Sequence, residues 1–273
     1  MRLSYLDPLT HLEAITILAI IFLLSIKFKF VDVGGVTASF VVGYVIYVFG
    51  GRNYFLALIA FYLVSVVFTK IRVRKVREVE NKESGIRGWR NVVANGITAT
   101  IAAIASGLSG EEKIFYAAYL GALSSAFADT LATEIGLLYP KMPRLITSMR
   151  KVKPGTPGAV TTLGYLGGLI GMTILALISS TIDRKFTLHE VFAIIFSSGL
   201  VGMTVDSLLG ATVQAKYRCR ICGKKTESPI HCGLRAEQVE GIEYINTHTV
   251  NFVATVIGAV TASIVTTFLT TTR

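Results

Sequence analysis

Acidic residues at the ends of two long apolar segments are the first feature that could do chemistry. Asp129 and Glu134 end the apolar segment 114–138, and Asp206 ends the segment 188–212. A charge at the centre of a bilayer costs about 3 kcal/mol on insertion scales, so acids in such segments mark functional sites by default. Carboxylate oxygens suit Mg²⁺, which proteins typically hold with one or two carboxylates and the phosphates of a substrate. We therefore expect Asp129 and Asp206, from neighbouring helices, to bind Mg²⁺ together.

Glu134 is the third candidate catalytic acid, and the sequence leaves its role open. It lies five residues after Asp129, about 140° around a helix, so the two carboxylates do not share a narrow face. Glu134 is therefore a third metal ligand, a base, or the partner of Arg87 or Arg90.

Glycines and cations near other predicted helix ends suggest that the metal site handles phosphate. The loop Gly155-Thr156-Pro157-Gly158 precedes a predicted helix, where backbone N–H groups and the positive helix end favour anions, and Lys153 adds charge. Carboxylates, a glycine loop and arginines together are typical of metal-dependent phosphoryl chemistry. Further candidate substrate- or nucleotide-binding residues lie near the same helix ends: Arg87, Arg90, Asn91, Asn95, Thr161, Ser207, Gln214, His248 and Asn251. The alternatives are an ordinary turn for the glycine loop and topology charges for the arginines.

All three cysteines lie in one loop, and their spacing predicts a structural metal. The first two form a Cys-x2-Cys-Gly turn typical of a zinc knuckle, and a His-Cys pair follows. The candidate Zn²⁺ ligands are Cys219, Cys222, His231 and Cys232. Two neighbouring residues, His231 and Cys232, are unfavourably placed to bind the same ion. The fourth ligand could therefore come from His248 or from a second chain. A disulfide is disfavoured in a cytoplasmic loop, and catalytic thiol chemistry is the weaker alternative. We expect Zn²⁺ to fix this loop, residues 213–248, over the mouth of the site.

These groups must be positioned by helices within a membrane. Of the 273 residues, 52% are hydrophobic and 16% are charged, against about 25% charged in a typical soluble domain. The charges are confined to short stretches between long uncharged runs, a pattern typical of helices that cross a bilayer. The sequence predicts eight spans: 11–28, 34–50, 53–69, 92–109, 114–138, 160–181, 188–212 and 249–270. The expected fold is an all-α polytopic integral membrane protein with one transmembrane domain, residues 1–273. If the short segment 34–50 does not cross the membrane, seven spans remain.

The basic residues set the orientation of these spans. The connections that follow the first, third, fifth and seventh spans carry most of the Lys and Arg, whereas the other connections are short and poorly charged. Cytoplasmic loops are rich in Lys and Arg, so this face is predicted to be cytoplasmic in the cell membrane. The same loops explain the net charge of +10 without a nucleic-acid partner. Because every candidate site residue lies near this face, we expect one polar cavity that opens to the cytoplasm.

The motifs now described resemble those of a known membrane family. The series Ala-Asp-Thr…Glu-Ile-Gly, followed by Asp-Ser-Leu-Leu-Gly-Ala-Thr-Val-Gln, is similar to the phytyl-phosphate kinase-like integral membrane proteins, which include plant enzymes and archaeal, bacterial and animal relatives. The matching stretches are 87–96, 128–136, 155–164, 202–214 and 248–251. The sequence departs from this pattern at Thr133, where Ser is common, and at Pro157, where Asn is frequent.

The resemblance implies an activity and its partners. It implies a kinase that transfers a phosphoryl group from CTP, or another nucleoside triphosphate, to an isoprenoid monophosphate such as a phytyl or geranylgeranyl phosphate. Mg²⁺ would bridge the two phosphates at the cytoplasmic face while the lipid tail lies between helices. The alternative function is a membrane transporter or flippase for an ion or an isoprenoid phosphate, because acids inside membranes also serve ion pathways.

Overall fold

The computed structural model describes residues 4–27, 32–77, 88–223 and 225–271. Within these residues, eight helices are long and apolar enough to cross a membrane. They are α1 (Pro8–Lys27), α2 (Val33–Gly50), α3 (Arg52–Arg77), α4 (Trp89–Ser109), α5 (Glu112–Gly136), α6 (Thr162–Ile182), α7 (Leu188–Thr212) and α8 (Thr247–Thr271). A short 3-10 helix, Ser4–Leu6, precedes them. The prediction of eight spans, including the short one at 34–50, is confirmed.

Helix α5 lies at the centre of the bundle and contacts α3, α4, α6, α7 and α8. Of its membrane-length window, 78% is buried within the protein, against 17% for the peripheral helix α1. Because α5 faces protein, it tolerates polar side chains that find partners on neighbouring helices. The Ser124 hydroxyl donates to the Ile195 carbonyl at 2.7 Å, and the Ser125 hydroxyl donates to the Ala254 carbonyl at 3.0 Å. These bonds hold α7 and α8 against the helix that carries Asp129.

Small residues let α6 approach α5 closely. A Cβ atom added at Gly167 would lie 2.6 Å from the Leu131 carbonyl oxygen, and one at Gly171 would lie 3.2 Å from a Leu131 methyl carbon. Any larger residue at Gly167 would push the helices apart. The glycine series of α6 is therefore a helix-packing surface of the kind common in membrane proteins.

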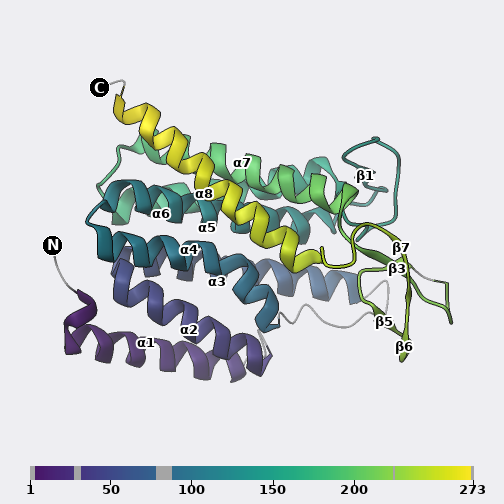
Figure 1. Ribbon diagram of the computed structural model, residues 1–273, viewed down its shortest axis with the longest axis horizontal. Coiled ribbons are helices and arrows are strands. Elements are labelled where there is room, and N and C mark those ends of the chain that lie inside the picture. The colour runs from purple at the N-terminus through teal and green to yellow at the C-terminus, as the bar shows by residue number, and fades with distance from the viewer. Residues whose placement is uncertain (1–3, 28–31, 78–87, 224, 272–273) are drawn as a thin grey trace.

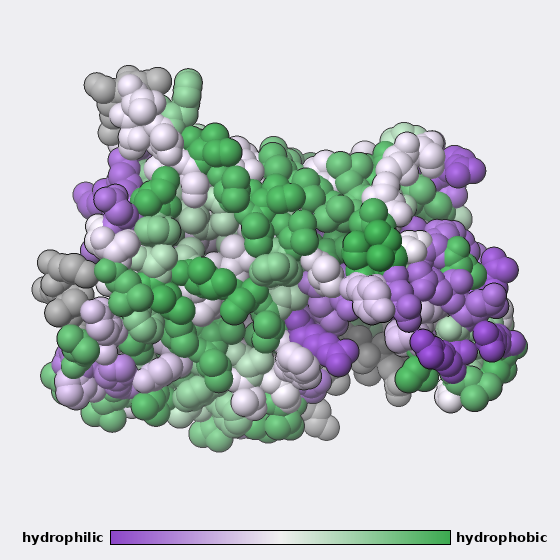
Figure 2. Space-filling model, in the orientation of Figure 1, coloured by the Kyte–Doolittle hydropathy of each residue, from purple (hydrophilic) through white to green (hydrophobic). Residues whose placement is uncertain are grey.

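The two ends of the bundle differ in character (Figure 1). Both chain termini lie at one end, and the strands between α5 and α6 and between α7 and α8 lie at the other. The connections α2–α3 and α4–α5 are short turns at Gly51 and Gly110, which both have positive φ. Figure 2 shows apolar residues over the middle of the molecule and hydrophilic residues gathered at the end with the strands. Two of the basic loops therefore share one end, as the positive-inside argument requires.

All strands in the described residues belong to the two long loops at this end. Strands β1 (Arg144–Leu145) and β2 (Ala159–Val160) pair between α5 and α6. Between α7 and α8, β4 (Lys225–Thr226), β3 (Lys216–Arg218) and β7 (Glu237–Glu240) form one sheet, and β5 (Ile230–His231) pairs with β6 (Leu234–Arg235). The sequence did not predict these strands, which leave the transmembrane part all-α. Because β2 occupies residues 159–160, α6 begins two residues later than predicted.

Candidate functional site

A polar cavity of about 390 Å³ opens at the strand-bearing end of the bundle. It lies between the last turns of α5 and α7, the first turns of α4, α6 and α8, and the loop before β2. Many of the predicted site residues line it: Asn91, Asn95, Asp129, Glu134, Gly155, Thr156, Gly158, Thr161, Asp206, Ser207, Gln214 and Asn251. The tertiary structure thus brings together residues that are up to 160 positions apart in the chain.

The two aspartates face this cavity and interact electrostatically. Both side chains are only partly exposed. Two oxygen-rich groups that repel each other in a recess are suited to share a cation, because a bound cation removes the repulsion. The roles of Asp129 and Asp206 as Mg²⁺ ligands stay a prediction.

An amide network orients Asp206. Once the Asn251 carboxamide is oriented to match its neighbours, its nitrogen donates to the Asp206 Oδ2 at 3.1 Å, and its oxygen accepts from the Asn95 Nδ2 at 3.2 Å. Asn95 also donates to the Asn91 carbonyl at 2.9 Å. Helices α4, α7 and α8 therefore meet through hydrogen bonds at the carboxylate, which fixes its direction toward the cavity.

Glu134 is anchored to α3. Its Oε1 accepts from the Thr69 hydroxyl at 2.8 Å, and its Oε2 accepts from the Arg72 Nε at 2.5 Å. This pairing could not be predicted from the sequence, because Arg72 belongs to a run of basic residues that also serves topology. Of the partners considered from the sequence, Arg87 lies outside the described residues. Glu134 thus ties the cavity wall to α3, whose described residues do not line the cavity.

The glycine loop packs against the end of α7, close to Asp206. Gly155 and Gly158 both have positive φ, and a Cβ atom at Gly158 would lie 2.5 Å from the Ala211 Cβ. Thr161 caps α6, since its hydroxyl accepts from the Gly164 N–H at 2.9 Å. A strand therefore separates the loop from the helix N-terminus, and both the loop and the first turn of α6 line the cavity.

Three residues that were predicted to bind substrate or nucleotide do not line the cavity: Arg90, Lys153 and His248. Lys153 is exposed and does not face the cavity. The Arg90 guanidinium lies 5.4 Å from the Trp89 ring centroid and interacts electrostatically with His248. Lys141 lines the cavity instead, together with Tyr139. Nothing in the sequence distinguished Lys141 from the other basic residues of its loop.

Glu227 is a further acid in the cavity that sequence reasoning missed. It comes from the cysteine-containing loop, interacts with the Gln214 side chain and adds to the negative potential at Asp206. Desolvation by the surrounding protein raises the pKa of the Glu227 carboxyl, and Gln214 and the Lys216 ammonium oppose that rise. The cavity therefore receives carboxylates from α5, α7 and this loop.

An apolar pocket of about 110 Å³ adjoins the polar cavity. Apolar side chains of α1 to α4 line it, among them Leu18, Phe40, Val42, Phe55 and Leu58. Asn91 and Asn95 line both spaces, so the two meet at the first turns of α4. A molecule with a charged head and an apolar tail fits such a junction.

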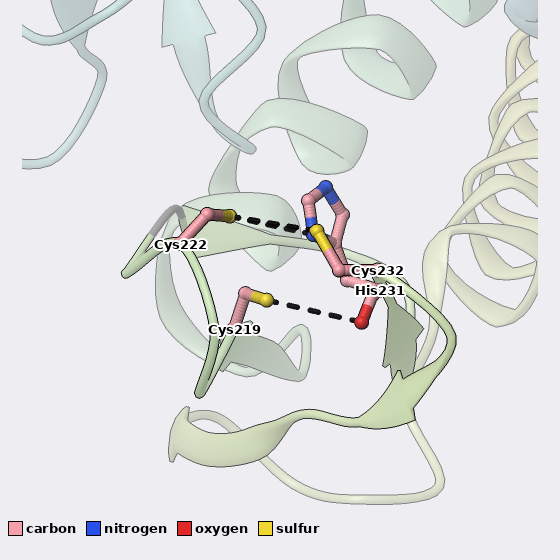
Figure 3. A group of neighbouring side chains, drawn as sticks. All are labelled: Cys219, Cys222, His231 and Cys232. Atoms are coloured by element: carbon pink, nitrogen blue, oxygen red, sulfur yellow. Dashed lines mark hydrogen bonds between the residues drawn. The ribbon is translucent and has the colours of Figure 1, made fainter.

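The four predicted zinc ligands also come together (Figure 3). The Cys222 Sγ lies 3.6 Å and the Cys232 Sγ 3.2 Å from the His231 Nδ1, and all four ligand atoms lie within 4.8 Å of one another. Cys232 has a φ of 53°, which turns its side chain toward the same point as that of its neighbour. The nitrogen atom of this group comes from His231 rather than from His248, and the assignment of the four side chains as zinc ligands stays a prediction. The backbone N–H of Cys222 lowers the pKa of Cys219 to about 6.

Comparison with known proteins places the chain among membrane proteins. The family described as "Integral membrane protein DUF92" matches residues 16–259. Protein PGR of Arabidopsis thaliana is 31% identical over 280 residues, covering 94% of this chain and 96% of the plant protein. Protein VTE6, chloroplastic, of the same plant is 28% identical over 52% of this chain and 44% of its own length. An uncharacterized membrane protein of Methanocaldococcus jannaschii is 28% identical over 65% of this chain and 74% of its own. No solved structure matches the chain.

Proposed function

Because this chain belongs to the integral membrane family DUF92, as its motifs predicted, we propose that it is a lipid-phosphate kinase. The substrate is an isoprenoid monophosphate, the product is the diphosphate, and CTP is the expected donor. The observation that carries the proposal is the junction at Asn91 and Asn95 between the acid-lined cavity and the apolar pocket.

The junction matches the two halves of the substrate. An isoprenoid chain gains about 25 cal/mol for each Å² of apolar surface that it removes from water, and the pocket between α1 and α4 offers apolar walls. The phosphate attached to that chain then lies at the first turns of α4, beside Asp129 and Asp206. A soluble nucleotide enters the cavity from the open side, away from the bundle.

The donor set of the cavity suits Mg²⁺, because two carboxylates with neighbouring amide and hydroxyl oxygens are hard ligands. Asp129 and Asp206 would hold the ion, which when bound neutralises charge on both phosphates. The glycine loop and Lys141 would face the phosphate oxygens. A phosphate oxygen of the lipid attacks the terminal phosphorus of the nucleotide, and the bond from that phosphorus to the oxygen of the leaving nucleoside diphosphate breaks. Positioning and charge neutralisation carry such a transfer, so no strong base is required.

Lys and Arg dominate the loops at the end where the cavity opens, and this supports a cytoplasmic active face. Cytoplasmic nucleotide would then reach the site directly.

Transport is the alternative, and the centre of the bundle disfavours it. A transported ion needs a polar path to the other face, but α5 places fully buried apolar residues below the cavity, including Leu120, Leu123 and Phe127. These side chains pack with those of neighbouring helices in the main apolar core.

The test is phosphoryl transfer by the purified protein in detergent with Mg²⁺, labelled CTP or ATP, and farnesyl, geranylgeranyl or phytyl monophosphate. We expect metal-dependent formation of the diphosphate, with CTP preferred. Asp129→Asn and Asp206→Asn should each lower turnover by at least about 10²-fold, because each removes charge stabilisation of the transition state. Asp7→Asn, at the opposite end, is the control. Wild-type turnover in folded Asp129→Asn protein would contradict the metal assignment.

A second variant tests the apolar pocket. Ser39 lines that pocket, so Ser39→Phe should fill it and raise KM for the longer isoprenoid phosphates. Mn²⁺ binding in the polar cavity should stay unchanged. An unchanged KM for every chain length would place the lipid elsewhere, and metal-dependent flux into liposomes without any transfer would favour transport.

A further inference from the structure

The loop between α7 and α8 carries both the Cys/His group and Glu227. Glu227 lies four positions before His231 and five positions after Cys222 in the sequence. The carboxylate lines the membrane-end cavity, whereas the Cys/His group lies apart from that lining. The segment between the cysteines and the histidine therefore links the two sites.

The geometry of the Cys/His group fits a tetrahedral ion. With zinc–sulfur bonds of about 2.3 Å and zinc–nitrogen bonds of about 2.1 Å, tetrahedral edges are about 3.8 Å between sulfurs and about 3.6 Å between sulfur and nitrogen. The separation of the Cys222 and Cys232 sulfurs is 3.9 Å, and the two sulfur–nitrogen separations to His231 are 3.6 and 3.2 Å. Cys219, buried at the end of β3, supplies the fourth atom.

Two turns with unusual backbone geometry aim these ligands at one point. The Gly223 N–H donates to the Cys219 carbonyl at 2.9 Å, and Gly223 has a φ of 66°. Cys232 has a φ of 53°, which non-glycine residues adopt only when the surroundings compensate. A bound ion would supply that compensation, because bonds to the metal hold both turns.

The loop has little else to hold its tip. Strands β4, β5 and β6 have two residues each, and the side chains of Ile230 and Leu234 are exposed. A two-stranded hairpin of this length is marginal in water. Small loops of this kind take their folding energy from the metal.

We propose that this group binds one Zn²⁺ and that the zinc holds the segment 225–231 so that Glu227 stays in the cavity. Glu227 is then the third carboxylate of the cation site, because it lines the same cavity as Asp129 and Asp206. The inference rests on the proposed function only where it assigns a cation to the cavity. According to this proposal, the cavity binds its cation tightly only when the Cys/His group holds zinc.

The first measurement is the metal content of untagged, full-length protein purified without chelators. One zinc per chain is expected in the wild type, and none in Cys222→Ser. Hydrogen exchange of residues 225–231, followed by mass spectrometry, should be faster in Cys222→Ser than in the wild type, while exchange in α5 stays the same. No zinc, a disulfide between two of the cysteines, or unchanged exchange in the zinc-free variant would each overturn the proposal.

The second measurement is Mn²⁺ binding, with Mn²⁺ as the spectroscopic probe for the cavity cation. Glu227→Gln and Cys222→Ser should each weaken binding by about tenfold, the size typical for groups that support a metal site. Glu237→Gln, an exposed acid on β7 of the same loop, is the matched control and should bind like the wild type. Wild-type affinity in Glu227→Gln would overturn the role of Glu227. Absence of Mn²⁺ binding in the wild type would refute the cation site in the cavity and with it the proposed function. The zinc content and the hydrogen exchange would still test whether zinc holds the loop.

Discussion

Replacement of Arg72 by methionine tests whether Glu134 is held in the cavity wall by α3. The Arg72 Nε donates to the Glu134 Oε2 at 2.5 Å, and the exposed fractions of the two side chains are 19% and 7%. Removal of one partner from a buried ion pair costs about 3–5 kcal/mol, because the remaining charge stays desolvated. Since Arg72 reaches some solvent, we expect the lower end, about 3 kcal/mol, for Arg72→Met.

A double-mutant cycle separates the pair from its surroundings. Glu134→Gln keeps the shape of the side chain and an acceptor for the Thr69 hydroxyl, so it should cost about 1–2 kcal/mol. With the charge removed from both sides, the double variant should cost about 2 kcal/mol, less than the sum of the single variants. The expected coupling energy is at least about 2 kcal/mol, within the range measured for contacting residues.

The assay is the apparent free energy of unfolding, obtained by titration from mild detergent into SDS and followed by helical circular dichroism. A coupling below about 0.5 kcal/mol would refute the argument, because residues that do not interact are additive within that margin. Mn²⁺ binding supplies the functional comparison. If the double variant is more stable than Arg72→Met and still binds Mn²⁺ like the wild type, the role of Glu134 is to anchor the cavity wall. If the double variant is more stable but binds Mn²⁺ more weakly than the wild type, Glu134 is a ligand of the cation.

Two further predictions concern the loops around the cavity. Gly158→Ala should destabilise the protein and lower phosphoryl transfer more than Gly155→Ala does. Both glycines have positive φ, a conformation that costs a residue with a side chain about 1–2 kcal/mol. Only at Gly158 would the added Cβ atom also overlap α7. Equal losses in thermal unfolding and transfer would contradict this. The Lys225 and Lys216 ammonium groups hold the pKa of Glu240 below its ordinary value of 4.5, so its ion pairs stabilise the fold above pH 4.5 and are lost as pH falls through the lowered pKa. Glu240→Gln should therefore cost less than about 1 kcal/mol at pH 7, because the side chain is 45% exposed, and progressively less as pH falls through the lowered pKa, when unfolding is measured as a function of pH. A loss that does not shrink as the pH falls would refute the ionic origin.

Much of the architecture could be predicted from the sequence, for a physical reason specific to membranes. A bilayer requires long apolar helices, so the eight spans follow from hydropathy alone, and the distribution of Lys and Arg orients them. An acid in such a span is costly enough to stand out, which is why Asp129 and Asp206 were identified. The Cys-x2-Cys-Gly turn was equally visible, since its ligands lie close together in the chain.

Features that depend on contacts between distant segments could not be predicted in this way. The partner of Glu134 in α3 is a basic residue among several, and only packing selects Arg72. Lys141 rather than Lys153 faces the cavity because the chain turns through β1 and β2 before α6 begins. Glu227 has no distinguishing neighbours in sequence, and its place in the cavity depends on how the loop folds. The same holds for the meeting of the polar cavity with the apolar pocket at Asn91 and Asn95, where helices distant in sequence converge. Sequence thus determined which groups are available in the membrane, whereas the tertiary structure decided which of them share a site, because that depends on the packing of helices against α5.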